Sequence, residues 1–320
     1  MIYYSLLTIA GIWHRIKPKP QVYLTRYPSV DILIPAHNEE VVIKETLEAM
    51  CALEYPGKLN VFLLDDRSTD RTAEIAKEFQ KTFSRVHYIS VPPGKPRGKA
   101  RVLNYGLSVT QADYIVVFDA DNRPEPSAVK LLVEAAESDP RAAGAVGYVK
   151  TINADTNLLT RMIALEFQVF QLIMQSGRWQ LFKLGSLPGT NMLLKRAVID
   201  ELGGYDPWAL AEDAELTMRI TASGYTLPVV SESVTWEQEP ENLKTFLKQR
   251  TRWFMGNIYL LEKSFFQTSY WKKKALFHSV QHVLTYLLFA VLLLVSHLIL
   301  ILSLVDLITP IYTAPILMFW

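Results

Sequence analysis

The sequence predicts an α/β protein with a doubly wound, mostly parallel sheet, because short apolar strands alternate with amphipathic helices. We expect strands at 30–35, 60–65, 86–91 and 113–118, each made largely of β-branched or other apolar residues. Helices are expected between them, where apolar side chains recur at helical spacing, at residues 39–53, 69–83 and 99–109. Almost continuously apolar strands are typical of a parallel sheet that helices cover on both faces.

Composition describes a large and nearly neutral chain. Its 320 residues suffice for one large domain or two smaller ones, and 33 Lys and Arg against 32 Asp and Glu give a net charge of +1. We expect no bulk basic surface, so nucleic acid is not a predicted partner. Cys51 is the only cysteine, which excludes an internal disulfide and suits a reducing cytoplasm.

Both ends of the chain are apolar, unlike the region between them. Residues 283–305 contain no charged side chain and exceed the roughly 20 residues that span a bilayer, so they predict a transmembrane helix. A buried core helix is the alternative, although such helices are usually shorter. Residues 2–13 are too few to span alone and predict an interfacial anchor or part of a longer helix.

Basic residues at 14–20 and 270–274 flank the apolar ends on their inner sides. By the positive-inside rule, the region between them is expected to face the cytoplasm at the cytoplasmic membrane. The predicted divisions are an apolar anchor with a basic linker at 1–29, a soluble α/β domain at 30–257, an interfacial segment at 258–282, a transmembrane helix at 283–305 and a partial second apolar segment at 306–320.

Residues 158–175, inside the soluble domain, are strongly apolar but too polar to span a bilayer. They predict a helix that lies in the plane of the membrane surface and shapes an acceptor channel. A helix of the protein core is the alternative reading of the same pattern.

Polar and acidic residues follow three of the four predicted strands. They are AHNEE at 36–40, DDRSTD at 65–70 and DAD at 119–121. In a doubly wound sheet the ligand site lies beyond the carboxyl ends of the strands, so these segments are expected on one rim. One acidic strand end is often only a turn or a helix cap, but three on one rim indicate a binding site.

Asp119 and Asp121 are the strongest candidates for metal ligands. If the backbone stays extended, residues two apart point to the same side of the strand. Two carboxylates on one side suit Mg²⁺ or Mn²⁺, which also takes oxygens from substrate phosphates. A turn without metal is the alternative, because a bare Asp-x-Asp is frequent by chance.

Seven motifs occur in an order and spacing that together resemble one family. They are PAHNE (35–39), DDRSTD (65–70), GKARVLN (98–104), DAD (119–121), GTNMLLKR (189–196), GGYDPWALAED (203–213) and QRTRW (249–253). The chain resembles, from about residue 30 to 257, the inverting family-2 glycosyltransferases with a GT-A fold. Within them it is similar to the membrane-embedded branch of cellulose, hyaluronan and poly-N-acetylglucosamine synthases.

The resemblance implies a nucleoside pocket in the loops after the first two strands. Asp66 would accept a hydrogen bond from the uracil imide N–H, since an ionised carboxylate only accepts. Lys99 would approach the diphosphate as a point charge, with a solvated lysine at a helix start as the alternative. Capping of the next helix is the alternative for the aspartates of DDRSTD, including Asp70. The implied nucleotide-binding residues are Pro35, Asn38, Glu39, Asp65, Asp66, Lys99 and Asp119.

The AED segment is where the resemblance places the catalytic base. The last Asp of a Thr-Glu-Asp motif removes the acceptor proton in the family, which matches Asp213, with Glu212 beside it as the next candidate. Ala211 stands where the family has Thr, a departure that removes a hydroxyl and keeps both acids. Two acids favoured by the dipole in the first turn of a helix are the alternative reading.

QRTRW carries a third group of implied roles. Gln249, Arg252 and Trp253 share one face of a helix. The Arg252 fork matches a diphosphate leaving group, and the Trp253 ring offers a face for stacking on a sugar. An amphipathic helix at a membrane surface is the alternative. The implied acceptor-binding residues are Thr190, Asn191, Gln249 and Trp253.

The resemblance implies metal-dependent transfer of a sugar, with inversion, from a UDP-sugar to a growing polysaccharide at the cytoplasmic membrane face. A non-processive glycolipid synthase, such as a diacylglycerol glycosyltransferase, is one alternative, and an inactive membrane scaffold of an export complex is another. A glycan or lipid acceptor, the lipid bilayer, and an export partner or a second copy are the implied partners. A nicotinamide dehydrogenase is disfavoured because no G-x-G-x-x-G follows the first strand.

Overall fold

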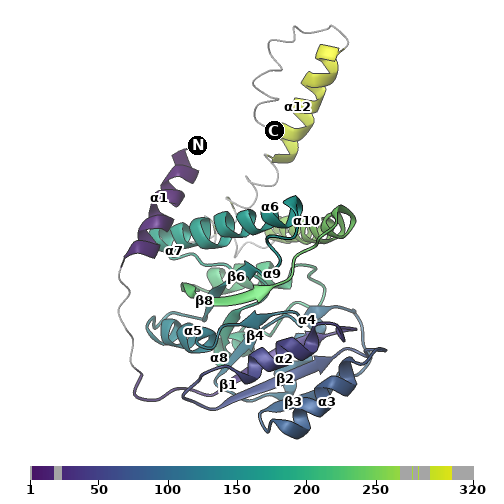
Figure 1. Cartoon of the computed structure of the whole chain (residues 1–320). Coiled ribbons are helices and arrows are strands. Elements are labelled where there is room, and N and C mark those ends of the chain that lie inside the picture. Colours follow the sequence, from purple (N-terminus) through teal and green to yellow (C-terminus); the bar gives the residue numbers. More distant parts are fainter. Residues whose placement is uncertain (1, 18–23, 267–275, 277–279, 281–288, 305–320) are drawn as a thin grey trace. The chain divides into compact units, whose positions relative to one another are not determined.

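The computed structural model describes residues 2–17, 24–266, 276, 280 and 289–304 (Figure 1). Its centre is an eight-stranded sheet in the order β3-β2-β1-β4-β7-β6-β8-β5. The four predicted strands are confirmed with small shifts at their ends. They are β1 (Val30–Ala36), β2 (Leu59–Asp65), β3 (Val86–Ser90) and β4 (Tyr114–Val117).

The sheet has a parallel half and a mixed half. In the half β3-β2-β1-β4 all strands are parallel, as predicted. In the other half β4 and β6 each pair antiparallel with β7, β6 pairs parallel with β8, and the short β5 pairs antiparallel with β8. Its strands are β5 (Arg123–Pro124), β6 (Gly144–Thr151), β7 (Met192–Lys195) and β8 (Val229–Glu237).

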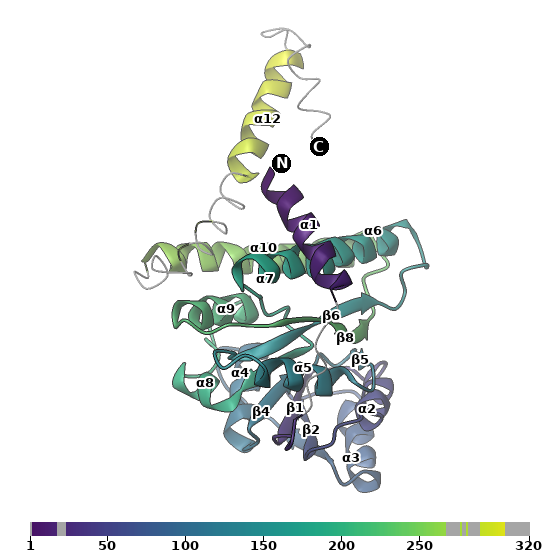
Figure 2. The ribbon, with the colours of Figure 1, turned by 90° about the vertical axis from the view of Figure 1, so that its left-hand side faces the viewer.

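Helices cover both faces of the sheet, which confirms the doubly wound arrangement (Figures 1 and 2). One buried cluster joins the sheet to α2 (Ile43–Cys51), α3 (Thr72–Thr82) and α5 (Ala128–Glu137). The other joins it to α4 (Lys99–Val109), α8 (Arg196–Glu201) and α9 (Glu212–Ala222). The interior of β1 is completely buried, because the strand is apolar toward both clusters.

A further layer of helices lies beyond β6 and β8 (Figures 1 and 2). It contains α1 (Ile2–Ile16), the run α6 (Leu158–Phe167), η1 (Gln168–Gln175) and α7 (Ser176–Phe182), and the start of α10 (Leu243–Phe266). Glycines bring α1 close to this run. A Cβ added at Gly11 would lie 2.1 Å from the Ile173 oxygen, and one at Gly177 would lie 2.1 Å from the Leu7 oxygen.

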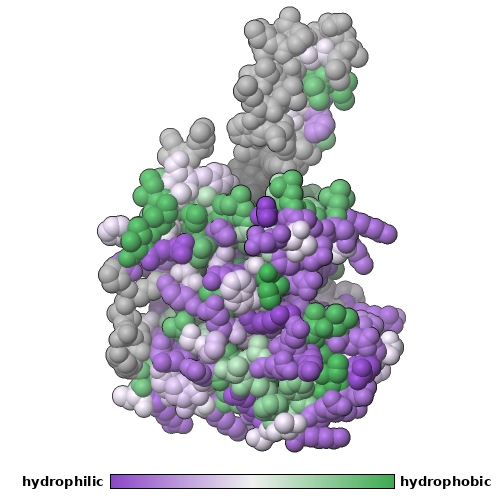
Figure 3. All heavy atoms as spheres, in the orientation of Figure 1, coloured by the Kyte–Doolittle hydropathy of each residue, from purple (hydrophilic) through white to green (hydrophobic). Residues whose placement is uncertain are grey.

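The predicted helix at 158–175 is present and continues to Phe182. It buries Ile163 and Phe167 against Val149 and leaves Leu158, Met162, Leu165 and Phe170 exposed. One face of this helix therefore packs on the core, and another face is exposed. Exposed apolar side chains also occur on α1 and α10, and Figure 3 shows hydrophobic residues gathered along this edge. Contact of this edge with a membrane stays a prediction.

The chain divides into two compact units, Met1–Leu260 and Leu261–Trp320. In the second unit, α12 (Phe289–Leu304) covers all but the first six residues and the last residue of the transmembrane helix predicted at 283–305. Residues 283–288, 305 and the predicted segment 306–320 lie outside the described residues, as do 18–23 of the basic linker and most of 267–282. No described helix is both long and apolar enough to cross a bilayer.

Candidate active site

The turn that follows β4 is fixed by hydrogen bonds from distant parts of the chain. The Asp119 N–H donates to Thr190 Oγ1 at 3.1 Å, and the Thr190 hydroxyl donates to Asn122 Oδ1 at 2.6 Å. The Thr46 hydroxyl donates to the Ala120 carbonyl at 2.7 Å. Asn122 is completely buried. These bonds fix the backbone that carries both predicted metal ligands.

Four carboxyl groups meet at this turn. Burial, and then the charge of Asp119, raise the pKa of Asp121 to about 6. Burial, and then Asp121 and Asp119, raise the pKa of Glu39 to about 7. Burial and the same two aspartates raise the pKa of Glu237 well above its ordinary value. Mutually repelling acids fit a divalent cation, because a cation favours the ionised form of each.

Asp119 and Asp121 are the side chains that would hold such a cation. Carboxylate oxygens suit Mg²⁺ and Mn²⁺, whose remaining ligands in nucleotide-dependent enzymes are waters and substrate phosphates. In the described ranges, no three His, Cys, Asp or Glu side chains form a metal-binding group. The metal prediction thus concerns a pair of carboxylates that a bound nucleotide would complete.

Lys99 lies between the two predicted metal ligands and the acids of α9. Its ammonium contacts Asp119, donates to the Gly189 carbonyl at 2.8 Å and lies 3.9 Å from Glu212 Oε1. Burial alone would lower the pKa of Lys99, but Asp119 and Glu212 raise it above its ordinary value. Lys99 is the first residue of α4, as predicted. It is therefore a cation placed between the two groups of acids.

The loops after β1 and β2 are tied to each other. Asn38, with φ of 59°, accepts from the Thr69 N–H at 2.8 Å, and its own N–H donates to Ser68 Oγ at 2.9 Å. Pro35 is half-buried at the end of β1, beside Leu64 of β2. Hydrogen bonds therefore fix the two loops in which the nucleoside pocket is predicted.

The three aspartates of DDRSTD have different surroundings. Asp65 is buried and accepts from the Ser68 N–H and the Tyr88 hydroxyl, both at 2.8 Å. Asp70 accepts from the N–H of Thr72, the first residue of α3, and from the Glu40 N–H, both at 3.0 Å, so its contacts at the helix start are structural.

Asp66 faces a residue that sequence reasoning missed. Arg101 Nη2 lies 2.5 Å from Asp66 Oδ1, and Arg67 Nε lies 3.2 Å from it. Burial raises the pKa of Asp66, but the hydrogen bonds from Arg101 and Arg67 outweigh burial and lower it. Asp66 is thus an ionised acceptor, as uracil recognition requires. Arg101 belongs to the GKARVLN motif, so the sequence could have indicated it as a site residue.

The acids of AED begin α9, on the other side of Lys99. Asp213 Oδ1 accepts from the Ala214 N–H at 2.8 Å, and a Cβ added at Gly189 would lie 3.1 Å from Asp213 Oδ2. Burial raises the pKa of Asp213. Burial raises the pKa of Glu212 to about 7, with Lys99 opposing. Raised carboxyl pKa values suit a group that must accept a proton near neutral pH.

The GGYD segment before α9 is held by α4. The Tyr205 N–H donates to Asn104 Oδ1 at 2.8 Å, and Asn104 Nδ2 donates to the Tyr205 carbonyl at 2.8 Å. Gly204 has φ of 77°, and a Cβ there would lie 2.7 Å from Asn104 Oδ1. Two separate motifs are therefore one structural unit that positions the acids of α9.

QRTRW lies on α10, as the helical pattern predicts. Arg252 is exposed, Gln249 is half-buried and Trp253 is 37 % exposed. The neighbouring Arg250, missed from sequence, forms a fork with both oxygens of Glu166 at 2.7 Å, and its guanidinium covers the Trp253 ring at 4.3 Å. Arg250 thereby fixes the tryptophan that is predicted to bind the acceptor.

Ala211 is where α10 approaches α9 most closely. A Cβ added at Gly256 would lie 2.7 Å from the Ala211 Cβ. The Tyr259 hydroxyl also donates to Asp206 Oδ2 at 2.9 Å. The small residue in place of the family's Thr therefore allows the helix of QRTRW to pack against the loop that carries the predicted base.

Thr190 and Asn191 have structural partners. Thr190 holds the turn after β4, as described above. Asn191, with φ of 46°, is completely buried and donates to the carbonyls of Tyr148 and Ser233 at 3.2 and 2.9 Å. Their predicted contact with an acceptor stays a prediction. Of the predicted residues, the structure brings Asp119, Asp121, Glu212 and Asp213 together around Lys99, and it places Glu39 near the two aspartates.

Two pairs of acids, Asp119 with Asp121 after β4 and Glu212 with Asp213 at the start of α9, therefore lie on either side of Lys99. A protein-family model described as "Glycosyltransferase like family 2" matches residues 28–256. The chain belongs to this family and is a glycosyltransferase. The expected α/β sheet with covering helices and the expected enzyme class are thereby confirmed, whereas the expected transmembrane helix stays a prediction.

Two curated relatives resemble the chain. It is 42% identical over 299 residues to a Bacillus subtilis (strain 168) protein named "Probable glycosyltransferase YdaM", covering 90% of this chain and 71% of that protein. It is 25% identical over 266 residues to the poly-beta-1,6-N-acetyl-D-glucosamine synthase of Staphylococcus aureus (strain COL), covering 83% of this chain. The matched part spans only 63% of that synthase.

Solved structures share the fold. The mannosyltransferase PcManGT from Pyrobaculum calidifontis, in complex with GDP-Man and Mn²⁺, superposes with a TM-score of 0.62 at 20% identity, covering 98% of this chain and 92% of that one. S. aureus TarS 1-349, in complex with UDP-GlcNAc, has a TM-score of 0.55 at 14% identity, covering 81% and 71%.

Proposed function

We propose that this chain transfers a sugar, with inversion, from a UDP-sugar to a growing polysaccharide of the poly-N-acetylglucosamine or cellulose type. The observation that carries the proposal is the position of Lys99, whose one ammonium contacts Asp119 and lies 3.9 Å from Glu212. Donor-side and acceptor-side acids are therefore close enough for one sugar to reach both. The S. aureus synthase, a relative over 83% of this chain, supports the polymer product.

Asp213 acts as the general base. It accepts the proton of the acceptor hydroxyl while that oxygen attacks the anomeric carbon, and the bond from that carbon to the UDP oxygen breaks as the new bond forms. Its raised pKa keeps it basic enough for this transfer. Glu212 is less suited, because its carboxylate lies 3.9 Å from the Lys99 ammonium.

Charge on the departing diphosphate is stabilised by Lys99 and Arg252. Lys99 exchanges Asp119 for a phosphate oxygen, and the exposed Arg252 offers a two-pronged donor that matches a diphosphate. Mg²⁺ or Mn²⁺, held by Asp121 and Asp119, would supply further neutralisation of the diphosphate. Asp66 holds the uracil imide, and the ionised state of Asp66 supports that role.

Membrane location is part of the proposal. We infer that the apolar edge made by α1, α6 and α10 rests on the cytoplasmic face of the membrane and that residues 283–305 span it. The exposed Trp13, Met162, Leu165 and Phe254 support contact with lipid. An export partner or a second copy would complete a path for the polymer.

A glycolipid synthase is the second candidate. The exposed Phe254, Met255 and Ile258 follow Trp253 on α10 and would suit a lipid acceptor. An inactive scaffold is disfavoured, because both acidic pairs and both arginines of QRTRW are present.

Membranes that contain the chain, supplied separately with radiolabelled UDP-N-acetylglucosamine, UDP-glucose and UDP-galactose, test the proposal. Labelled material that resists lipid extraction and is degraded by a glycosidase supports the polymer. Label that extracts with lipid supports the glycolipid synthase, and no transfer from any of the three donors contradicts both.

A further inference from the structure

Glu239 is a buried carboxyl group outside the machinery described above. It follows β8 and is only 2% exposed, yet neither of its oxygens has a hydrogen bond of ordinary geometry. A buried carboxylate without partners is costly, so its presence calls for an explanation. The segment is not loosely held, because Asn153 bonds both the N–H and the carbonyl of Glu239 at 2.9 Å.

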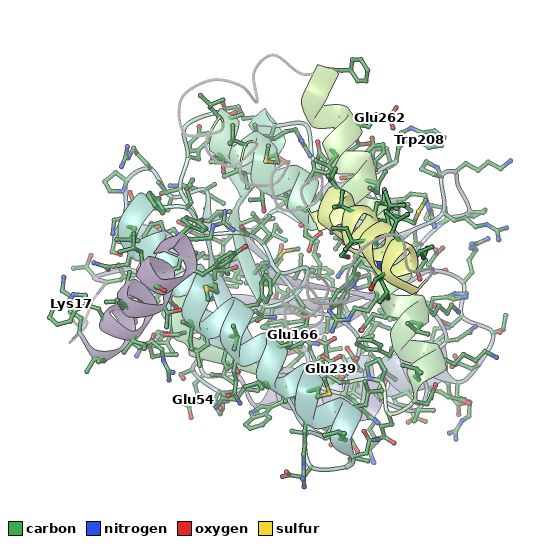
Figure 4. All side chains as sticks on the ribbon, turned by 90° about the horizontal axis from the view of Figure 1, so that it is seen from above. Lys17, Glu54, Glu166, Trp208, Glu239 and Glu262 are labelled. Atoms are coloured by element: carbon green, nitrogen blue, oxygen red, sulfur yellow. The ribbon has the colours of Figure 1, made fainter. Side chains whose placement is uncertain are left out.

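Arg250 is the expected counter-ion of Glu239, but its terminal nitrogens bond to Glu166 instead. Figure 4 shows Glu239 and Glu166 beside each other, and both interact with Arg250. Both terminal nitrogens of Arg250 bond to Glu166 at 2.7 Å, and its plane covers the Trp253 ring. Arg250 thus favours the charge on Glu239 without satisfying its oxygens.

The surroundings of Glu239 place it at the junction of donor and acceptor. The strand β8 passes the turn after β4, where Thr235 donates to Asn122 at 3.3 Å. Burial raises the pKa of Glu239 to about 7, with the Gln249 amide and Arg250 opposing and Asp121 adding to the rise. Gln249 Oε1 is itself buried without a hydrogen bond. The carboxylate of Glu239 and the amide oxygen of Gln249 therefore lie close together, and both can accept further hydrogen bonds.

We propose that Glu239, together with Gln249, binds a hydroxyl group of the acceptor sugar and so contributes to acceptor specificity. The acceptor is favoured over the transferred sugar because Gln249 lies one helical turn from Trp253, and because Arg250, which covers the Trp253 ring, also interacts with Glu239. Hydroxyl groups are the matching ligand, since both side chains offer oxygen acceptors. The inference rests on the proposed polysaccharide synthesis.

The test compares Glu239→Gln with wild type and with a matched control, Glu241→Gln. Glu241 is exposed, lies two residues away and accepts from Asn153 at 3.0 Å, which Gln also allows. With UDP-N-acetylglucosamine as donor and a β-1,6-linked N-acetylglucosamine oligosaccharide as acceptor, Glu239→Gln should raise the acceptor KM about tenfold or more. UDP affinity and donor hydrolysis should not change, and Glu241→Gln should match wild type. Gln249→Leu should raise the same KM.

An unchanged acceptor KM in Glu239→Gln, or a raised donor KM alone, overturns the inference. Thermal unfolding at pH 8 adds a readout that needs no substrate. A carboxylate kept for a ligand destabilises the free protein, so Glu239→Gln should raise Tm by about 2 °C or more. A lower Tm would show a structural role and overturn the proposal. Failure of the proposed function appears instead as absence of transfer by the wild type.

Discussion

The proposed donor side and the proposed acceptor side of this site are built in different ways. Acids of the donor side stand at the ends of β1, β2 and β4, where a parallel ladder fixes the backbone and short loops bond to each other. Acids and aromatics of the acceptor side stand on α9 and α10, which side-chain contacts such as Asn104 to Tyr205 and Glu166 to Arg250 hold in place. Backbone ladders resist change, whereas side-chain contacts vary with single substitutions. Donor binding and acceptor use should therefore be separable by mutation.

Metal removal should produce the largest effect on the donor side. Asp121→Asn, or saturating chelator, should lower turnover by about 10³-fold or more and weaken metal-dependent UDP binding, because the cation offsets several kcal/mol of diphosphate charge. Calorimetry with UDP, with and without Mn²⁺, measures the binding. Full activity in chelator would contradict the role of the pair.

Arg252→Ala should lower kcat by roughly 10²-fold and change donor KM much less. Its exposed guanidinium acts mainly on charge that develops in the transition state. Arg252→Lys should recover only part of the rate, since Lys lacks the two-pronged donor. Equal rescue by Lys would show that a point charge is sufficient.

Trp253→Ala should raise the acceptor KM by about tenfold, the loss expected for one stacked ring and its buried area. UDP affinity and slow hydrolysis of the donor should stay at wild-type values. Steady-state kinetics with varied acceptor measures the acceptor KM, and UDP release without acceptor measures hydrolysis of the donor. Loss of UDP binding would place this helix on the donor side instead.

Ala211→Thr, which installs the residue of the family, should have the smallest effect. The added atoms press on Gly256 of α10, and overpacking of this kind costs about 1–3 kcal/mol. Thermal unfolding should show a lower Tm, and Gly256→Ala should show a similar drop. An unchanged Tm in both variants would mean that this contact is easily relaxed.

The parallel half of the fold and its rim were predictable because their signals are local. An apolar strand, a polar loop and a helix within 40 residues determine each unit, as β1 with Glu39 and β4 with Asp119 illustrate. The missed residues depend on distant partners. Asn122 bonds to Thr190 and Thr235, which lie 68 and 113 positions away.

The acceptor side shows the same limit of sequence reasoning. Arg250 was overlooked because its partner Glu166 lies 84 positions away on a separate helix. Glu237 is the last residue of β8 and Glu239 lies two residues beyond it, but β8 was not among the predicted strands, because serine, threonine and glutamate interrupt its apolar residues. Its antiparallel pairing with β5 brings its end to the metal aspartates.

Measuring both the UDP affinity and the turnover of Asp213→Asn tests most directly whether the donor side and the acceptor side are separate. Asp213 belongs to the acceptor side, so its loss should lower transfer by at least about 10²-fold. UDP binding, measured by calorimetry with Mn²⁺, should stay within error of wild type, in contrast to Asp121→Asn. Near wild-type turnover would move the base to Glu212, and loss of UDP affinity together with turnover would contradict the separation of the two sides.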